Sequence, residues 1–531
     1  MATLLPLVLV CGGCKPDKNK AAAKPDAGAA ASKVRATKPK PKVGADGVPA
    51  FMDNAPTLPA AKTPDLPLAK RFKLPAGLEV RYIEKRDLPL VRFGLLIKRG
   101  TASAAPGVAY VTAKMLAEGA GKRGALDLSA ALQQIGAELS ISIGLDFIEI
   151  DLEVLKRHVD AGLSLLSDIV QRPRFEPTEL RRLAQRLAAR AQSRRARATA
   201  VAPLVFHKVL FGEDPYGIPR LPTPAVIRSV KRAAVVAFHR DAFTPDSAVL
   251  AVAGDIDRAG LVTALGTHFG SWKAQGSKKQ GAAAAKPPAD DKREDKRSKK
   301  GKAAQAKAPR LVFVDKPGAP QSVLRIGMRC PGRRSVKLAP LRALFKVLGG
   351  SFTSRLNQSL RETHGYTYGA SASASLYRRA GLVAVRTSVK TSVTEPAIVE
   401  IMKQLEAIRD APVTPAEANK ARRQLIDAMP ARLESVSGLV DAQTTLALYD
   451  LPLDADRRLA TEYAAVSAAD MQAVARARLR LGQLTIVVVG DTSTFAKKLE
   501  KRYGPATYLG PDGEALPRPK AKPAGKAKGK R

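Results

Sequence analysis

The chain has 531 residues, of which 45% are hydrophobic, and it carries a formal net charge of +41. Its length leaves room for two or three domains, and its hydrophobic content is ordinary for folded protein, which excludes a chain that is disordered throughout. No run of 18 apolar residues occurs, so no membrane-spanning helix is expected.

The N-terminus begins M-A-T-L-L-P-L-V-L-V-C-G-G-C, a short apolar run that ends in small residues and Cys14. This pattern resembles the signal and lipidation site of a bacterial lipoprotein, with Cys14 as the acylated residue. No Lys or Arg precedes the apolar run, and Cys11 stands where leucine is usual. The expected location is the bacterial cell envelope, lipid-anchored and facing the periplasm; the alternative is an unprocessed cytoplasmic chain.

Much of the positive charge lies in three segments, 15–47, 273–309 and 514–531, which are rich in Lys, Ala and Pro. Segments with so few large apolar side chains cannot bury enough surface to offset the entropy of ordering. The domain boundaries expected from this composition are a signal over 1–14, a disordered tether over 15–70, a first domain over 71–272, a basic linker over 273–309, a second domain over 310–509 and a basic tail over 510–531.

The first domain is predicted to mix strands and helices. Apolar alternation predicts strands, and apolar residues at helical spacing predict helices. In chain order the predicted elements are strands over 74–84 and 88–100, helices over 108–118 and 126–135, one or two strands within 139–150, helices over 154–170 and 180–191, and a strand over 248–254.

The second domain repeats the plan of the first. The stretch Val91–Gly100 has its counterpart in Val323–Gly332, and the strand that ends at Asp255 has its counterpart in one that ends at Asp491. Two separate matches at nearly the same offset indicate a tandem duplication of one α+β domain. Cys330 falls in an apolar, alternating stretch and is expected in the core or at a strand end.

Residues 349–374 carry the densest pattern in the chain. Two helical pieces flank Gly349 and Gly350, the second piece ends at Gly365, and alternation then predicts a strand that includes Tyr368. Arg361, in the last helical turn, and Tyr368 would meet at this corner and could hold a peptide carbonyl. The alternative is an arginine that satisfies helix C-terminal carbonyls and a tyrosine that packs across strands.

The pattern G-G-S-F-x-S-R-L followed by L-R-E-x-x-G-Y-x-Y resembles the second-half signature of the insulysin, pitrilysin and mitochondrial-processing-peptidase family, the inverzincin zinc peptidases. The resemblance runs from about residue 74 to 509. It implies an α+β fold of two tandem homologous domains, each a mostly antiparallel sheet with packed helices, that face each other across a cavity. It also implies that Arg361 and Tyr368 bind the substrate carbonyl beside the zinc. The residues expected to contact substrate also include Gly349, Gly350, Ser351 and Phe352.

The family's zinc motif H-x-x-E-H falls on degenerate positions in this chain. Tyr110 and Lys114 stand in place of the histidines, and Ala113 stands in place of the glutamate base. The third ligand, a glutamate about 75 residues further on, falls near Arg190. Because an ammonium group and an arginine-rich helix repel a divalent cation and offer it no ligand, no metal and no other cofactor is expected on this chain.

In some bacterial members of the family, the zinc lies in one subunit and the Arg/Tyr pair in another. The resemblance therefore implies a pseudoenzyme, inactive alone, that serves as the substrate-binding subunit of a heteromeric zinc endopeptidase. The expected partners are a zinc-bearing insulinase-like subunit and an extended peptide substrate. The zinc is expected on the partner subunit.

The alternative is a non-catalytic envelope lipoprotein that binds polyanions or peptides through its basic segments and the cavity between its domains. The linker over 273–309 holds 12 Lys or Arg against 4 Asp or Glu. Such runs bind acidic surfaces in a salt-dependent way. No aromatic residues interleave with these charges, so specific nucleic-acid binding is not expected.

Overall fold

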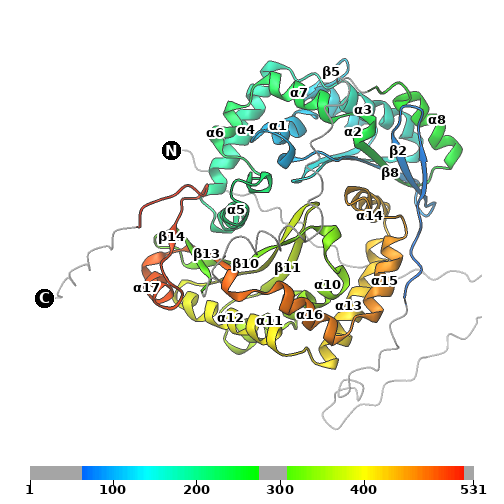
Figure 1. Ribbon diagram of the computed structural model, residues 1–531. Helices are drawn as coiled ribbons and strands as arrows, with labels where there is room; N and C mark the ends of the chain where they lie inside the picture. The colour runs from blue at the N-terminus through cyan, green and yellow to red at the C-terminus, as the bar shows by residue number, and fades with distance from the viewer. Residues whose placement is uncertain (1–62, 274–307, 519–531) are drawn as a thin grey trace, which may run out of the picture. The chain divides into compact units, whose positions relative to one another are not determined.

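The computed structural model describes residues 63–273 and 308–518 (Figure 1). The described residues belong to one compact unit. Cys14, the tether up to residue 62, the linker over 274–307 and the tail from 519 lie outside the described residues. Within the two described ranges, no helix is long and apolar enough to cross a membrane.

The first domain is built on a six-stranded sheet in the order β1-β2-β8-β3-β7-β6. Its strands are β1 Lys70–Lys73, β2 Glu79–Glu84, β3 Leu90–Ile97, β6 Glu138–Ile143, β7 Ile148–Leu155 and β8 Ala248–Gly254, and a small hairpin adds β4 Gly119–Ala120 and β5 Arg123–Gly124. Its helices are α1 Val108–Met115, α2 Ala125–Gln134, α3 Val159–Gln171, α4 Pro177–Arg195, α5 Ala198–Phe211, α6 Pro224–Ser229, α7 Arg232–Ala242 and α8 Arg258–Phe269.

The second domain has a six-stranded sheet in the order β11-β12-β10-β13-β9-β14. Its strands are β9 Arg310–Asp315, β10 Gln321–Pro331, β11 Ala370–Leu376, β12 Ala380–Lys390, β13 Thr485–Gly490 and β14 Thr507–Tyr508. Its helices are α10 Leu338–Gly349, α11 Arg355–Asn357 with a π-helical turn over Gln358–Thr363, α12 Thr394–Asp410, α13 Pro415–Arg432, α14 Val436–Leu448, α15 Ala455–Ala465, α16 Ala468–Arg478 and α17 Thr492–Tyr503.

The two sheets correspond strand by strand, which confirms the α+β fold of two similar domains. In each, the central pairings are antiparallel except one: β2 runs parallel to β8, and β9 runs parallel to β13. The corresponding pairs are β2 and β9, β8 and β13, β3 and β10, β7 and β12, and β6 and β11. The outermost strands differ, because β1 is antiparallel to β2 whereas β14 is parallel to β9.

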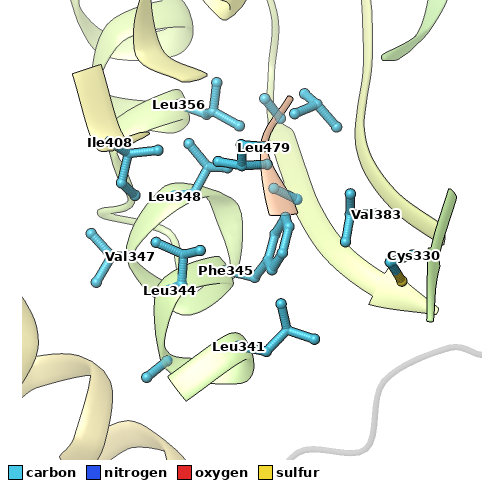
Figure 2. Packing of buried hydrophobic residues seen from close by; sticks show 14 of the residues in the cluster. Cys330, Leu341, Leu344, Phe345, Val347, Leu348, Leu356, Val383, Ile408 and Leu479 are labelled. Carbon is cyan, nitrogen blue, oxygen red and sulfur yellow. The ribbon is translucent and has the colours of Figure 1, made fainter. Parts of the chain in front are cut away.

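The core of the second domain forms around α10 (Figure 2). Leu341, Leu344 and Leu348 recur at helical spacing and are each at most 1% exposed. They pack with Val383 of β12 and Ile408 of α12. Burying one such side chain contributes about 1.5–3 kcal/mol relative to leaving it in water, so this face fixes α10 against the sheet.

Each domain sends one helix onto the sheet of the other. Helix α5 of the first domain packs on β10 and β13, and α14 of the second packs on β3 and β8. Val205 and Phe206 of α5 share a buried cluster with Val323 of β10 and Val487 of β13. These contacts bring the N-terminus of α5 to the face of the second sheet.

Three segments differ from the sequence expectation. The predicted helix over 154–170 begins at Val159, because β7 continues to Leu155 and stays paired with β3. Residues 63–69 lie within the expected tether, yet Leu66 is only 2% exposed and its carbonyl accepts a hydrogen bond from Arg457 at 2.6 Å. Residues 510–518 lie within the expected tail, and there Asp512 forms an ion pair with Arg195 at 3.0 Å.

Candidate functional site

Helix α1 carries the three positions where the sequence analysis placed the degenerate zinc motif. Ala113 is fully buried in the core of the first domain. Lys114 is half-buried, and its Nζ donates a hydrogen bond to the carbonyl oxygen of Ile141 in edge strand β6 at 2.8 Å. Burial lowers the pKa of Lys114, and the charge of Arg190 lowers it further. Arg190 of α4 is thus near enough for its charge to act on Lys114.

Tyr110 lies in the same basic surroundings. Burial raises the pKa of its phenol, while the positive charges of Arg194, Arg190 and Arg220 oppose that rise. Arg194 itself is held in place by hydrogen bonds from its Nη2 to the carbonyls of Leu221 and Pro222. Zinc requires thiolate, imidazole or carboxylate ligands, and this cluster supplies ammonium and guanidinium groups instead. These residues do not fit a zinc ion.

A second group of residues has the carboxylate spacing of a metal site. Carboxylate oxygens of Glu149, Asp151 and Asp441 lie within 4.8 Å of one another. The guanidinium of Arg92 already contacts this group, at 3.2 Å from Asp151 and 3.9 Å from Asp441. Because Arg92 contacts two of the three carboxylates, the cluster is explained as an ion-pair network between β3, β7 and α14. Sequence reasoning missed it because α14 lies far along the chain from β7.

Glu149 makes this network sensitive to pH. Burial, and then the charge of Asp151, raises the pKa of Glu149 to about 7, and burial raises that of Asp151 to about 6. Because these pKa values exceed those of unfolded carboxyls, the associated stability is complete below about pH 4 and is lost as the pH rises through 6 to 7.

We expect Glu149→Gln to remove about half of that pH dependence, because the raised pKa of Asp151 remains. At pH 8 the variant avoids a buried charge worth about 3 kcal/mol and should melt several degrees higher than the wild type, whereas at pH 5 the two should match. Thermal unfolding at both pH values measures the difference, with Glu138→Gln on the exposed face of β6 as the control. A change in melting temperature that is equal at both pH values would contradict this interpretation.

The segment 349–352 is held close to β11. Gly349 ends α10 at a point where an added Cβ would lie 2.4 Å from the backbone nitrogen of Ala372, so glycine permits this approach. Ser351 accepts a hydrogen bond at its carbonyl from Asn357 Nδ2 at 3.0 Å. Asn357 is 8% exposed, and its Oδ1 accepts from the backbone N–H of Ala370 at 2.8 Å. The side chain of Asn357 thus joins the segment 349–352 to the start of β11.

Arg361 lies in the π-helical turn that follows α11. Its guanidinium stacks over the ring of Phe352 at 4.2 Å and contacts Glu362 at 3.3 Å. Phe352 is 64% exposed, so the stacked pair faces solvent. Gly365, with a φ of +63°, ends the turn in the left-handed conformation that favours glycine.

Tyr368 does not lie in a strand, which corrects the sequence expectation. Strand β11 begins at Ala370, and Tyr368 lies in the loop before it with 95% of its surface exposed. The hydroxyl of Thr367 donates to the carbonyl of Ser388 and accepts from the N–H of Gly369, which holds this loop out of the ladder. Among the described residues, no interaction joins Tyr368 to Arg361, so their joint role on a carbonyl stays a prediction.

Tyr368 opens onto a pocket of about 300 Å³ that the sequence analysis did not anticipate. Arg325 of β10 and Arg386 of β12 line it, together with Thr199 of α5. The one signal of this pocket in the sequence was Arg325, a charged residue within the alternating apolar stretch that forms β10. Its meaning depends on the pairing of β10 with β12, which the sequence pattern alone does not give.

The fold and the site define a protein of two similar α+β domains, in which the positions expected to bind zinc hold Tyr110, Ala113 and Lys114. Two family models match the chain: "Insulinase (Peptidase family M16)" over residues 80–223 and "Peptidase M16 inactive domain" over residues 229–425. The chain belongs to the M16 peptidase family.

The relatives of this chain include proteins named as zinc proteases and a protein named as a non-peptidase homolog. An uncharacterized zinc protease of Mycobacterium tuberculosis is 26% identical over 84% of this chain and 93% of its own length. A protein of Helicobacter pylori named as a non-peptidase homolog is 22% identical over 78% of this chain and 92% of its own length. These two relatives therefore match most of the chain.

Solved structures agree on the fold. An M16 inactive domain from Pseudomonas fluorescens superposes with a TM-score of 0.70 at 20% identity, covering 80% of this chain and 98% of its own. A protease from Helicobacter pylori superposes with a TM-score of 0.73 at 17% identity, covering 80% of this chain and 100% of its own.

Proposed function

We propose that this chain is the zinc-less, substrate-binding subunit of a heteromeric zinc endopeptidase. In this proposal, Arg361 and Tyr368 hold the backbone carbonyl of an extended peptide beside the zinc of a partner subunit. The observation that carries it is the contrast between two places in the fold. The family's metal positions hold a basic cluster around Lys114, whereas Arg361, Phe352 and Tyr368 remain accessible.

The chemistry left on the chain is too weak for hydrolysis without a partner. Zinc lowers the pKa of bound water from about 15.7 to about 7, which raises the supply of hydroxide at neutral pH by about eight orders of magnitude. An oxyanion donor contributes about two to three orders of magnitude. Arg361 and Tyr368 together cannot replace the metal, so the chain is expected to be inactive alone.

The exposed aromatics favour a ligand rather than a purely structural role for this corner. Tyr368 and Phe352 are the two most exposed aromatic side chains among the large hydrophobic residues that the structure describes. Exposed aromatics beside an arginine are common at the centre of binding surfaces. Strand β11, with the sequence A-S-A-S-A-S-L, is also the outermost strand on one side of its sheet in the described part of the chain, and an extended peptide can add beside such a strand.

Mixing tests the proposal directly. We expect a quenched peptide substrate to be cleaved when this chain is combined with a zinc-bearing M16 relative from the same cell, and not when either protein is present alone. The control is the same mixture in which the partner's motif glutamate is replaced by glutamine, which should abolish cleavage because the general base is lost. A partner that is equally active without this chain would contradict the proposal.

A further inference from the structure

Two arginines face each other in the second sheet without an acidic partner. Arg325 of β10 lies directly opposite Arg386 of β12 in the antiparallel register. The Nε of Arg325 is buried without a hydrogen-bond partner, and Arg386 donates to the hydroxyl of Ser373 at 3.1 Å. Across the described parts of the chain, none of the ion pairs includes either residue. Like charges directly opposite destabilise a sheet, so this pair calls for a balancing anion.

The tandem duplication supplies an internal comparison. The run Arg-Phe-Gly over 92–94 of β3 matches Arg-Ile-Gly over 325–327 of β10, so Arg92 corresponds to Arg325, and the residue directly opposite Arg92 in β7 is Glu153. Arg92 contacts Glu153 at 3.5 Å, in addition to Asp151 and Asp441. The first domain therefore neutralises this arginine with its own carboxylates. The second domain places another arginine, Arg386, where the first has glutamate.

The surroundings of the pair extend its positive character. The N-terminus of α5 reaches the pocket through Thr199, and no side chain caps that helix end. The positive end of a helix dipole favours an anion at this position. Burial, and then the nearby charge of Arg386, lowers the pKa of Arg325 to about 10.

We infer that the pocket lined by Arg325, Arg386 and Tyr368 binds the carboxylate of an acidic residue in an extended peptide. The peptide is the favoured occupant because Tyr368 lies at the mouth of the pocket and is also the residue proposed to hold a substrate carbonyl. In this respect the inference rests on the proposed function. The zinc-less chain would then select peptides with Asp or Glu close to the bond that the partner cleaves.

The inference is tested by peptide binding to this chain without a partner or zinc. The probes are two fluorescent peptides that differ at one central position, Glu or Gln, and the readout is fluorescence anisotropy. We expect the Glu peptide to bind about tenfold or more tightly, since a hydrogen bond to a charged group has that value. Arg325→Gln and Arg386→Gln should each remove most of this preference.

Arg458→Gln is the matched control. Arg458 is an exposed residue of α15 that pairs with Asp454, so this variant removes the same charge away from the pocket and should keep the preference. If Arg325→Gln fails to fold, Arg386→Gln still decides, because Arg386 is exposed. Equal binding of the Glu and Gln peptides, or an equal loss in Arg458→Gln, would overturn the inference.

Inorganic phosphate serves as a competitor. Displacement of the Glu peptide by phosphate in the wild type, and not in Arg386→Gln, supports an oxyanion pocket that a peptide carboxylate fills. Phosphate binding without any preference for the Glu peptide would overturn the peptide as occupant. This binding assay contains no partner subunit. A preference for the Glu peptide can therefore be found even if the mixture of subunits does not cleave peptides, and the two proposals are judged separately.

Discussion

Arg361→Ala is expected to lower kcat/KM of the mixed enzyme by about a hundredfold or more, because a positively charged oxyanion donor would be lost. The guanidinium is held over the ring of Phe352 at 4.2 Å, and this stacking restricts its position before substrate binds. An interaction made in the transition state should change kcat more than KM. Steady-state kinetics of the mixture, at fixed partner concentration, give both values.

Two further variants sharpen this experiment. Tyr368→Phe removes a single hydroxyl that is exposed to solvent, so any loss of rate reports on that group and not on folding. Arg409→Ala on α12 serves as the control, since Arg409 pairs with its neighbour Asp410 away from the site. Unchanged turnover in Arg361→Ala would remove this residue from the mechanism.

Asn357→Ala is expected to destabilise the second domain by about 2–3 kcal/mol, because one buried and one partly buried backbone group lose their partner. Asn357 bonds the carbonyl of Ser351 at 3.0 Å and the N–H of Ala370 at 2.8 Å. Without it, the loop that carries Phe352 and the loop that carries Tyr368 are no longer tied together. Activity of the mixture should therefore fall about tenfold or more even at temperatures where the variant is folded.

Denaturant unfolding measures the loss of stability. Hydrogen exchange at the amide of Ala370 measures whether the two loops are still held together. That amide should exchange faster in Asn357→Ala while amides in the core strand β10 keep their relative protection. Asn419→Ala, at an exposed position of α13, is the matched control. A variant that unfolds like the wild type would show that Asn357 does not hold the site together.

The sequence was sufficient for the architecture because hydrophobic periodicity and the internal repeat are both local signals. The helix predicted to begin at Val108 and the strand over 248–254 appear as α1 and β8. The duplication seen in the two strand motifs reappears as two sheets with the same strand order.

The features that the sequence did not predict depend on contacts that a local sequence pattern does not reveal. Tyr368 was expected in a strand because its neighbours alternate, but side-chain hydrogen bonds of Thr367 hold that loop apart. The significance of Arg325 depends on which residue lies across from it in β12. The acidic cluster around Arg92 requires α14 of the second domain to reach the first sheet. Pairing register and the packing of one domain on the other determine these features.

The most direct test of the account is to count zinc in the purified chain and in its mixture with a zinc-bearing relative, alongside peptide hydrolysis. The account predicts no bound zinc and no hydrolysis for this chain alone, and one zinc with hydrolysis for the mixed enzyme. Stoichiometric zinc and hydrolysis by this chain alone would contradict it, because the basic cluster around Lys114 would then not mark a lost metal site.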